Sequence, residues 1–410
     1  MNIILFDGIS RGHLLPLTLT RPVADIRIGI TTIREKWELK LQEKTSTYTL
    51  PYLQDKFPLL IRDDNILIDG SLIPDDDLAE KIISLRSGDA LLFGKRIIAC
   101  RVCREKLEYC FSGRTVDENG LELPELKKAI PVLSEVSLIQ KLTDIFTLNG
   151  ECLRADFRAL TKGRQSQPIS PSNRIIGDKE AIFIETGVIM EGATLNSLQG
   201  PIYIGENAEI MEGSFLRGNV SVGEHAIVKV GARIFKDTTI GPYCKVSGEI
   251  NNVVFIGYSN KAHDGYLGNS VIGEWCNIAA GSNFSNLQNN YNTTKQWDYM
   301  QQDYRDTGLQ FCGVVMGDHT KCSINSKFNS GTVTGVCCNL FGTEFHSGFI
   351  PSFSYGGDAR YTLNRIDKVL ETAERVFSRR GITFDHKEKD LLLSLFRQNQ
   401  ERLKKNTSLY

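Results

Sequence analysis

A run of aliphatic residues at a spacing of six constrains this chain more than any other feature. A helix does not produce a period of six, and neither does an alternating strand. Hexapeptide repeats are the signature of a parallel β-helix, in which each aliphatic side chain points into a narrow shared core. Glycine follows several of them, as in Ile204-Gly205 and Val222-Gly223, and allows the chain to turn a corner. The run in one frame is Ile204, Ile210, Leu216, Val222, Val228, Ile234, Ile240 and Val246.

Length and composition indicate a two-domain globular protein. A chain of 410 residues is long for one core, and 41% hydrophobic with 24% charged residues is ordinary for such proteins. The 48 basic and 49 acidic residues give a net charge of −1, which argues against a nucleic-acid partner. No stretch approaches the ~20 apolar residues of a membrane span, and the N-terminus lacks the charged start of a signal peptide. We therefore expect a cytoplasmic protein without a membrane partner, whose ten cysteines are reduced, mostly buried thiols.

The texture of the sequence divides the chain into four parts. Residues 1–162 alternate short apolar runs with helical stretches and predict an α/β domain. Residues 163–174 are polar, carry two prolines and predict a linker. Residues 175–358 form the predicted β-helix, interrupted at 285–311 by a polar, aromatic-rich loop. Residues 359–410 show a helical period and predict C-terminal helices that cap or flank the β-helix.

The six-residue spacing breaks between Ile256 and Leu267, and His263 lies inside this break in the stretch KAHDGYLG. An irregular corner places side chains outside the coil. The longer segment KAHDGYLGNSVIGEWCNIAAGSNFSN resembles the acetyltransferase segment of the bifunctional N-acetylglucosamine-1-phosphate uridyltransferase/glucosamine-1-phosphate acetyltransferase family. That family places a catalytic histidine three residues before a Tyr-Leu-Gly, and an asparagine in an N-I-x-A-G run. The resemblance implies an α/β nucleotidyltransferase-like domain followed by a left-handed parallel β-helix that trimerises.

The residue types suit acetyl transfer from acetyl-CoA to an amine. Imidazole titrates near neutrality, so His263 is the candidate general base, and Asn277 is the candidate for orienting the acceptor or the developing oxyanion. The resemblance implies further roles for neighbouring residues. For the acceptor they are Arg233, Glu249 and Tyr266, and for acetyl-CoA they are Ala279, Ala280 and Asn286.

Two positions depart from the family pattern. Asn251 replaces a lysine that binds the sugar phosphate, and Leu287 replaces a tyrosine next to the later asparagine.

A zinc centre is an alternative for a protein of this shape. Gamma-type carbonic anhydrases hold zinc with three histidines on a β-helix, two of them closely spaced. Here the histidines are far apart in the sequence, which argues against such a centre. They are His225, His263 and His319.

The stretch LLPLTLTRPVADIRIG, residues 14–29, resembles the signature of sugar-phosphate nucleotidyltransferases. Register places His13 and Val23 where that family has an arginine and a lysine for the phosphates. The charges either come from shifted arginines, or the domain is mainly structural and its charges are ordinary surface pairs. The nucleotide-binding candidates are Gly8, Arg11, Arg21, Asp25 and Arg27. For Mg²⁺, the resemblance implies Asp69 and Asn149.

The resemblance implies sugar-nucleotide synthesis by a homotrimer. One activity is N-acetylation of an amino-sugar 1-phosphate by acetyl-CoA, and the other is uridylyl transfer from UTP with Mg²⁺. Two alternatives remain open. The chain is either an acetyltransferase with a silent N-terminal domain, or a nucleotide-sugar-binding scaffold without catalysis.

Overall fold

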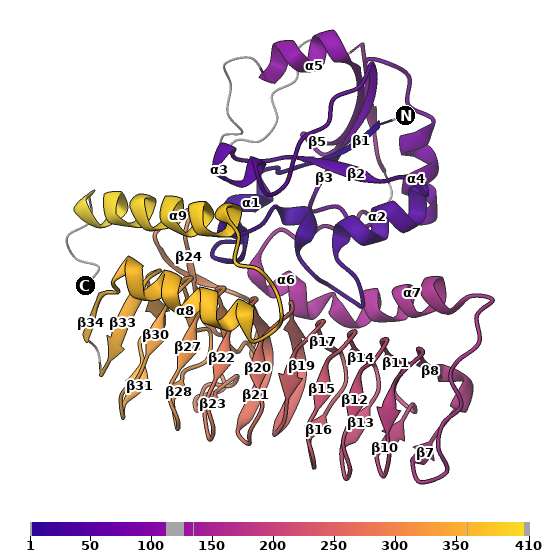
Figure 1. Ribbon diagram of the computed structural model, residues 1–410. Helices are drawn as coiled ribbons and strands as arrows, with labels where there is room; N and C mark the ends of the chain where they lie inside the picture. Colours follow the sequence, from indigo (N-terminus) through magenta and orange to yellow (C-terminus); the bar gives the residue numbers. More distant parts are fainter. Residues whose placement is uncertain (1, 112–126, 134, 359, 406–410) are drawn as a thin grey trace. The chain divides into compact units, whose positions relative to one another are not determined.

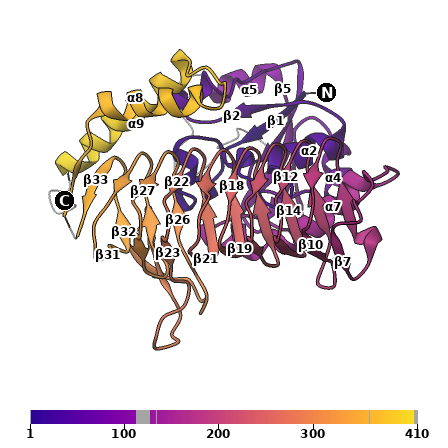
Figure 2. The ribbon, with the colours of Figure 1, turned by 60° about the horizontal axis from the view of Figure 1, so that its bottom comes forward.

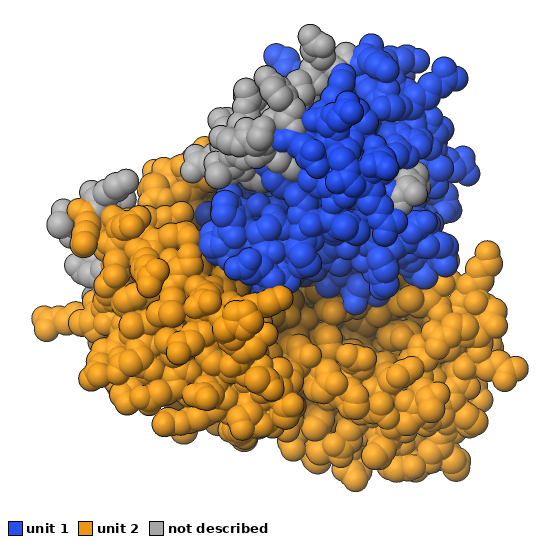
Figure 3. All heavy atoms as spheres, turned by 45° about the horizontal axis from the view of Figure 1, so that its top comes forward, with its two compact units in different colours: residues 1–26, 31–141 blue, residues 27–30, 142–410 orange. Residues whose placement is uncertain are grey.

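The computed structural model describes residues 2–111, 127–133, 135–358 and 360–405. They form two compact units, coloured separately in Figure 3. Unit 1 consists of Met1–Ile26 and Thr31–Lys141, and unit 2 consists of Arg27–Ile30 and Leu142–Tyr410. None of the helices in the described part of the chain combines the length and apolar composition that a bilayer crossing requires.

Unit 1 is an α/β domain around a six-stranded sheet of order β2-β1-β3-β5-β4-β6 (Figure 1). Strand β1 is parallel to both of its neighbours, and all five of its residues are buried, as expected for a strand at the centre of a covered sheet. Strand β5 runs antiparallel to β3 and β4. The strands are β1 (Asn2–Phe6), β2 (Thr45–Tyr48), β3 (Asp64–Asp69), β4 (Asp89–Phe93), β5 (Arg96–Cys103) and β6 (Lys128–Pro131). The helices are α1 (Ser10–His13), η1 (Leu17–Leu19), η2 (Val23–Asp25), α2 (Ile33–Leu41), α3 (Pro51–Gln54), α4 (Asp76–Ile83) and α5 (Arg104–Phe111).

Two helices that we expected in the first domain, residues 1–162, group with the β-helix instead. They are α6 (Leu142–Thr147) and α7 (Asn149–Thr161), and α6 contacts β19 and β21. The short segment Arg27–Ile30 belongs to the same unit.

The rest of unit 2 is a parallel β-helix of the left-handed type followed by two helices, so the expected fold class is confirmed (Figures 1 and 2). Equivalent strands of successive coils pair in parallel and build long sheets along the helix. The first strands, with one 3₁₀ turn, are β7 (Arg174–Ile176), η3 (Lys179–Ala181), β8 (Ile182–Ile184), β9 (Ile189–Met190), β10 (Thr194–Asn196), β11 (Ile202–Ile204), β12 (Glu209–Ile210), β13 (Phe215–Arg217), β14 (Val220–Val222), β15 (Ile227–Val228), β16 (Arg233–Ile234), β17 (Thr238–Ile240) and β18 (Lys245–Val246). Next come β19 (Glu249–Phe255), β20 (Asn260–Lys261), β21 (Tyr266–Ile272), β22 (Asn277–Ile278), β23 (Asn283–Phe284), β26 (Val315–Met316), β27 (Lys321–Cys322), β28 (Lys327–Phe328), β29 (Val333–Thr334), β30 (Asn339–Leu340), β31 (Phe345–His346), β32 (Phe349–Ile350), β33 (Ser354–Gly357) and β34 (Arg360–Leu363).

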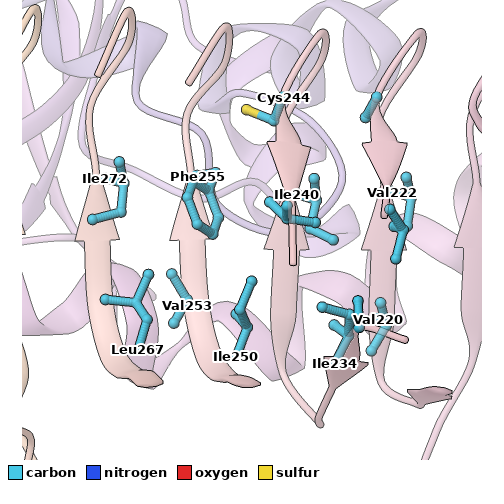
Figure 4. Close-up of a cluster of buried hydrophobic side chains, with 14 of the residues drawn as sticks. Val220, Val222, Ile234, Ile240, Cys244, Ile250, Val253, Phe255, Leu267 and Ile272 are labelled. Atoms are coloured by element: carbon cyan, nitrogen blue, oxygen red, sulfur yellow. The ribbon is translucent and has the colours of Figure 1, made fainter. Parts of the chain in front are cut away.

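The aliphatic residues of the six-residue pattern fill the interior, as predicted (Figure 4). Ile210, Val228 and Val246 pair in register at 18-residue steps, which corresponds to one coil of three hexapeptides. Close stacking of the coils also explains the glycines. A Cβ on Gly223 would lie 2.7 Å from the backbone nitrogen of Pro242 in the next coil.

The interior stack changes at the break in the pattern. The partner of Val246 in the next coil is Lys261, which follows after 15 residues instead of 18. Lys261 is only 1% exposed and is among the largest fully buried side chains of the described chain. A lysine therefore takes an interior place that aliphatic residues hold in the neighbouring coils.

The expected insertion at 285–311 contains an antiparallel hairpin of β24 (Lys295–Asp298) and β25 (Asp303–Asp306), which projects from the coils in Figure 2. The C-terminal helices are α8 (Ile366–Ser378) and α9 (His386–Lys405). Both views show α8 lying along one sheet of the β-helix. Phe377 fixes the end of α8 by stacking on Trp275, with ring centroids 4.0 Å apart. The C-terminal helices thus flank the β-helix.

Candidate active site

A cleft of about 580 Å³ lies on the β-helix beneath the C-terminal end of α8. His263, Asn277, Ala279 and Ala280 line it together. The histidine lies in the turn between β20 and β21 and is exposed, and Asn277 begins β22 with its side chain exposed. The structure thus brings the predicted base, the predicted orienting asparagine and two of the three predicted acetyl-CoA residues into one cavity.

The buried Lys261 shapes the turn that carries His263. Its Nζ donates hydrogen bonds to the backbone oxygen of His263 at 2.8 Å and to that of Ser247 at 3.2 Å. Burial lowers the pKa of Lys261 to about 8, because an ammonium group loses solvation inside the coil. The hydrogen bonds tie the start of the turn to the preceding coil.

The predicted acceptor residues form a second group on another sheet of the coil. Arg233, Glu249 and Tyr266 are neighbours in the strand register, and Arg233 Nε lies 3.8 Å from Glu249 Oε2. The Tyr266 hydroxyl accepts a hydrogen bond from Asn286 Nδ2 at 2.9 Å, and burial raises the pKa of this tyrosine. Neither the three acceptor residues nor Asn286 are among the described residues that line the cleft. The expected site residues therefore divide into a His263 group and a Tyr266 group.

Four cationic residues of the cleft were missed by the sequence reasoning. Lys245 and Lys321 each precede an inward-facing residue in the sheet that contains Asn277. The six-residue repeat could therefore have predicted that both lysines lie on the outer face of this sheet, as Asn277 does. Arg379 and Arg380 follow α8 and line the cleft. The repeat could not predict them, because it does not show where this helix packs. Arg380 Nη2 donates to Asn260 Oδ1 at 2.8 Å, and Asn260 Nδ2 lies 3.5 Å from Asn277 Oδ1.

An aromatic row runs along one corner of the coils beside the cleft. His225 stacks on Tyr243, Tyr243 on Tyr258, and Tyr258 on Trp275, with centroid distances of 4.8, 5.0 and 4.3 Å. His319 continues the row at 6.3 Å from Trp275. His225 and His319 thus stack in this aromatic row, whereas His263 lies outside it.

The loop after β1 holds the predicted nucleotide-binding residues in internal contacts. Gly8 packs so closely on Asp69 that a Cβ would lie 2.5 Å from its Oδ2. Arg11 donates to the backbone oxygen of Thr18 at 2.8 Å and lies 3.3 Å from Asp7. The buried Arg21 donates to the Leu17 oxygen at 3.2 Å. A separate ion pair joins Asp25 to Arg34 at 2.7 Å.

The remaining candidates for nucleotide and Mg²⁺ binding also form ion pairs or hydrogen bonds within the protein. In unit 1, Asp69 pairs with Arg96 at 2.5 Å. In unit 2, Arg27 donates to the Ile256 oxygen at 3.0 Å. Asn149 Oδ1 accepts from the Gly29 amide at 2.7 Å and from the Thr239 hydroxyl at 3.1 Å, and Nδ2 donates to the Asp237 oxygen at 2.8 Å. Asp69 and Asn149 therefore belong to different units, and both side chains already have partners.

Comparisons with known proteins agree with this architecture. Residues 3–165 match the family model described as "Sugar nucleotidyl transferase". A curated relative, the bifunctional protein GlmU of Carboxydothermus hydrogenoformans, is 24% identical over 270 residues, and the match covers 57% of each protein. The chain thus spans a little over half the length of that relative.

Among solved structures, the chain is similar to UDP-N-acetylglucosamine acyltransferases. The Arabidopsis enzyme is 16% identical, with 59% of this chain and 91% of that one covered at a TM-score of 0.30. The Moraxella catarrhalis enzyme is 16% identical, with 57% and 93% covered at a TM-score of 0.28. At these TM-scores the likenesses do not bear on function.

The family match covers the α/β domain and the GlmU match extends over a longer part of the chain. The expected resemblance is therefore confirmed. Residues 3–165 are similar to sugar nucleotidyl transferases, and a longer part of the chain, which includes part of the left-handed β-helix, is similar to GlmU, from which it has diverged to 24% identity.

Proposed function

We propose that this protein is a bifunctional enzyme of sugar-nucleotide synthesis. Its β-helix transfers an acetyl group from acetyl-CoA to an amino-sugar 1-phosphate, and its N-terminal domain transfers a uridylyl group from UTP to the acetylated product. The observation that carries the proposal is the cleft in which His263 and Asn277 lie beside Ala279 and Ala280. By the family resemblance, the working form is a homotrimer, which a mass measurement in solution tests.

The proposed acetyl transfer needs a neutral amine. His263 takes a proton from the acceptor ammonium, and the amine nitrogen then attacks the thioester carbonyl. The new C–N bond forms and the C–S bond breaks, and the CoA sulfur leaves as the thiol with the proton that His263 had taken. The nitrogen releases its second surplus proton to solvent, which leaves the neutral amide. Asn277 lies in the same cleft and is the group that orients the acceptor or the oxyanion. Positioning of both reactants next to one base supplies the remaining acceleration.

The test is thiol release from acetyl-CoA with glucosamine 1-phosphate as acceptor. We expect His263→Ala to lower kcat by roughly 10²- to 10⁴-fold, as for the loss of a general base. The matched control is His225→Ala, because His225 is also an exposed histidine of the β-helix but lies in the corner row. Unchanged thiol release in the His263 variant would refute the acetyl-transfer proposal.

For the uridylyl transfer, Mg²⁺ enters with the phosphates of UTP and screens their charge. Asp69 and Asn149 do not suit a resident Mg²⁺ site as they stand. Asp69 is paired with Arg96, and the amide of Asn149 makes three hydrogen bonds within unit 2. We therefore derive no step through a protein-bound metal.

A second candidate function is acetyl transfer alone, with a silent N-terminal domain. The internal contacts of Arg11, Arg21 and Asp25 favour it, because these side chains are held by backbone oxygens and by Arg34. Pyrophosphate release from UTP and N-acetylglucosamine 1-phosphate separates the two. Release supports the bifunctional enzyme, and its absence beside active acetyl transfer supports the second candidate. Nucleotide-sugar binding without either activity would indicate a scaffold.

A further inference from the structure

The cleft beside His263 carries a concentration of positive charge. Lys245, Lys321, Arg379 and Arg380 line it, and the described residues that line it include no carboxylate. Within the described part of the chain, none of the four forms an ion pair within 4.0 Å. Basic side chains on this protein are otherwise often paired, as in Arg96–Asp69 and Arg164–Glu185. The cluster therefore differs from an ordinary charged surface.

The electrostatics show that these cations repel one another. The pKa of Lys245 is lowered by burial and then by the positive charges of Arg380, Lys229 and Arg379. Burial also lowers the pKa of Arg380, and Arg379 adds to this effect. Holding like charges together in a partly buried cleft costs free energy unless an anion compensates them. The protein thus maintains a local excess of positive charge that a bound anion relieves.

Specific contacts hold the cations in place. Phe377 is 3% exposed and stacks on Trp275, which fixes the end of α8 two residues before Arg379. The hydrogen bond from Arg380 to Asn260 directs that guanidinium to the strand next to Asn277. Lys321 donates to the backbone oxygen of His319 at 2.8 Å. The site is therefore built by the packing of α8 onto the β-helix.

We propose that Lys245, Arg379 and Arg380 form a phosphate-binding subsite, which holds a phosphate ester of the substrate while its reacting group lies at His263. The proposal rests on the function proposed above and adds a role for the C-terminal helix. If the phosphate ester is that of the acceptor, the subsite also supplies the positive charge that Asn251 lacks, since Asn251 stands where the family resemblance implies a lysine for the sugar phosphate. The phosphate ester belongs either to the acceptor sugar or to coenzyme A, and both present the same dianionic group to guanidinium and ammonium donors.

The principal experiment measures KM for both substrates in the variant Arg379→Gln/Arg380→Gln. Loss of two charge-assisted contacts predicts a roughly 10- to 100-fold higher KM for the phosphate-bearing partner, with kcat changed much less. A rise for glucosamine 1-phosphate that disappears with glucosamine assigns the subsite to the acceptor. A rise for acetyl-CoA that disappears with acetyl-pantetheine assigns it to the donor. Unchanged KM values for both substrates overturn the proposal.

Controls separate the subsite from the fold and from the proposed function. Arg375→Gln is the matched variant, because Arg375 lies in the last turns of α8, just before Arg379, and pairs with Glu371 outside the cleft. If the double variant does not fold, Arg380→Gln and Lys245→Gln replace it.

Calorimetric binding of inorganic pyrophosphate to the His263→Ala variant gives a readout without turnover. Pyrophosphate binding that depends on Arg379 and Arg380, together with a wild-type protein that shows no acetyl transfer, supports the subsite and rejects the proposed function. Acetyl transfer with pyrophosphate binding that does not depend on them rejects the subsite alone.

Discussion

Replacement of Lys261 by methionine is the sharpest test of the interior of the β-helix. Methionine is unbranched and of similar length, so it fills the same space without the ammonium group. In the wild type, the folded state holds the lysine with a pKa of about 8, whereas the ordinary value is 10.5. Between these two pH values the unfolded chain binds more protons than the folded chain. The stability of the wild type therefore rises with pH across this window, and that of K261M lacks this contribution.

The size of the effect follows from the two pKa values. Proton linkage gives the wild type roughly 2 to 3 kcal/mol of stability relative to K261M between pH 7 and pH 10. For a domain of this size, 1 kcal/mol corresponds to about 2–4 °C in Tm. The difference in Tm, wild type minus K261M, should therefore rise by roughly 5 to 10 °C over this range. Other titrating groups are common to both proteins and cancel in the difference.

The assay is thermal melting of the β-helix, followed by circular dichroism at several pH values. Lys295→Met is the control, because Lys295 is exposed on the projecting hairpin strand β24. If the Tm values of wild type and K261M change in parallel from pH 7 to pH 10, the pKa of Lys261 is not lowered by burial inside the coil. The same variant should lower kcat of acetyl transfer by about 10-fold or more, because the His263 turn loses its anchor.

Three further variants test other contacts. Phe377→Ala should cost about 3 to 5 kcal/mol of local packing, seen as faster hydrogen exchange in α8, and should weaken pyrophosphate binding as the double arginine variant does. Unchanged exchange would contradict the docking of α8. Asn149→Ala should destabilise unit 2 by about 2 to 4 kcal/mol, because it leaves buried partners unsatisfied. Full stability with loss of pyrophosphate release would instead assign Asn149 to the nucleotide site. Tyr266→Phe should cost about 1 kcal/mol, and a rise in KM for the sugar phosphate would show that the Tyr266 group contacts the acceptor.

The repeat predicted the fold well because the period reports directly which residues face inward. Ile210, Val228 and Val246 stack as the six-residue pattern predicts. The prediction ended where the period ended. After Val246 the coil is shorter, so the six-residue spacing does not predict that Lys261 points inward. Lysine is mostly exposed in proteins, so its residue type does not predict burial either.

The N-terminal candidates show a different limit. From their places in matched segments, Arg27 is predicted to bind the nucleotide and Asn149 to bind Mg²⁺. In the structure both belong to unit 2, and both make hydrogen bonds there with residues far away in the sequence. Such long-range partners have no local signal in one sequence. Motif register therefore located the strands and helices of this region better than it located the partners of its side chains.

The position of α8 changes how the candidate site is defined. A helix that only covered the coil edge would need an apolar face, and Val369, Ala373 and Phe377 supply one. That face does not require two arginines in succession after the last turn, nor a hydrogen bond from one of them to the strand beside Asn277. Buried or crowded cations without carboxylates are costly, so packing alone does not account for them. The β-helix supplies the proposed base and the proposed orienting asparagine, and the helix that follows it in the chain supplies positive charge to the same cleft. The candidate site is thus a joint product of the hexapeptide coils and of the C-terminal helix.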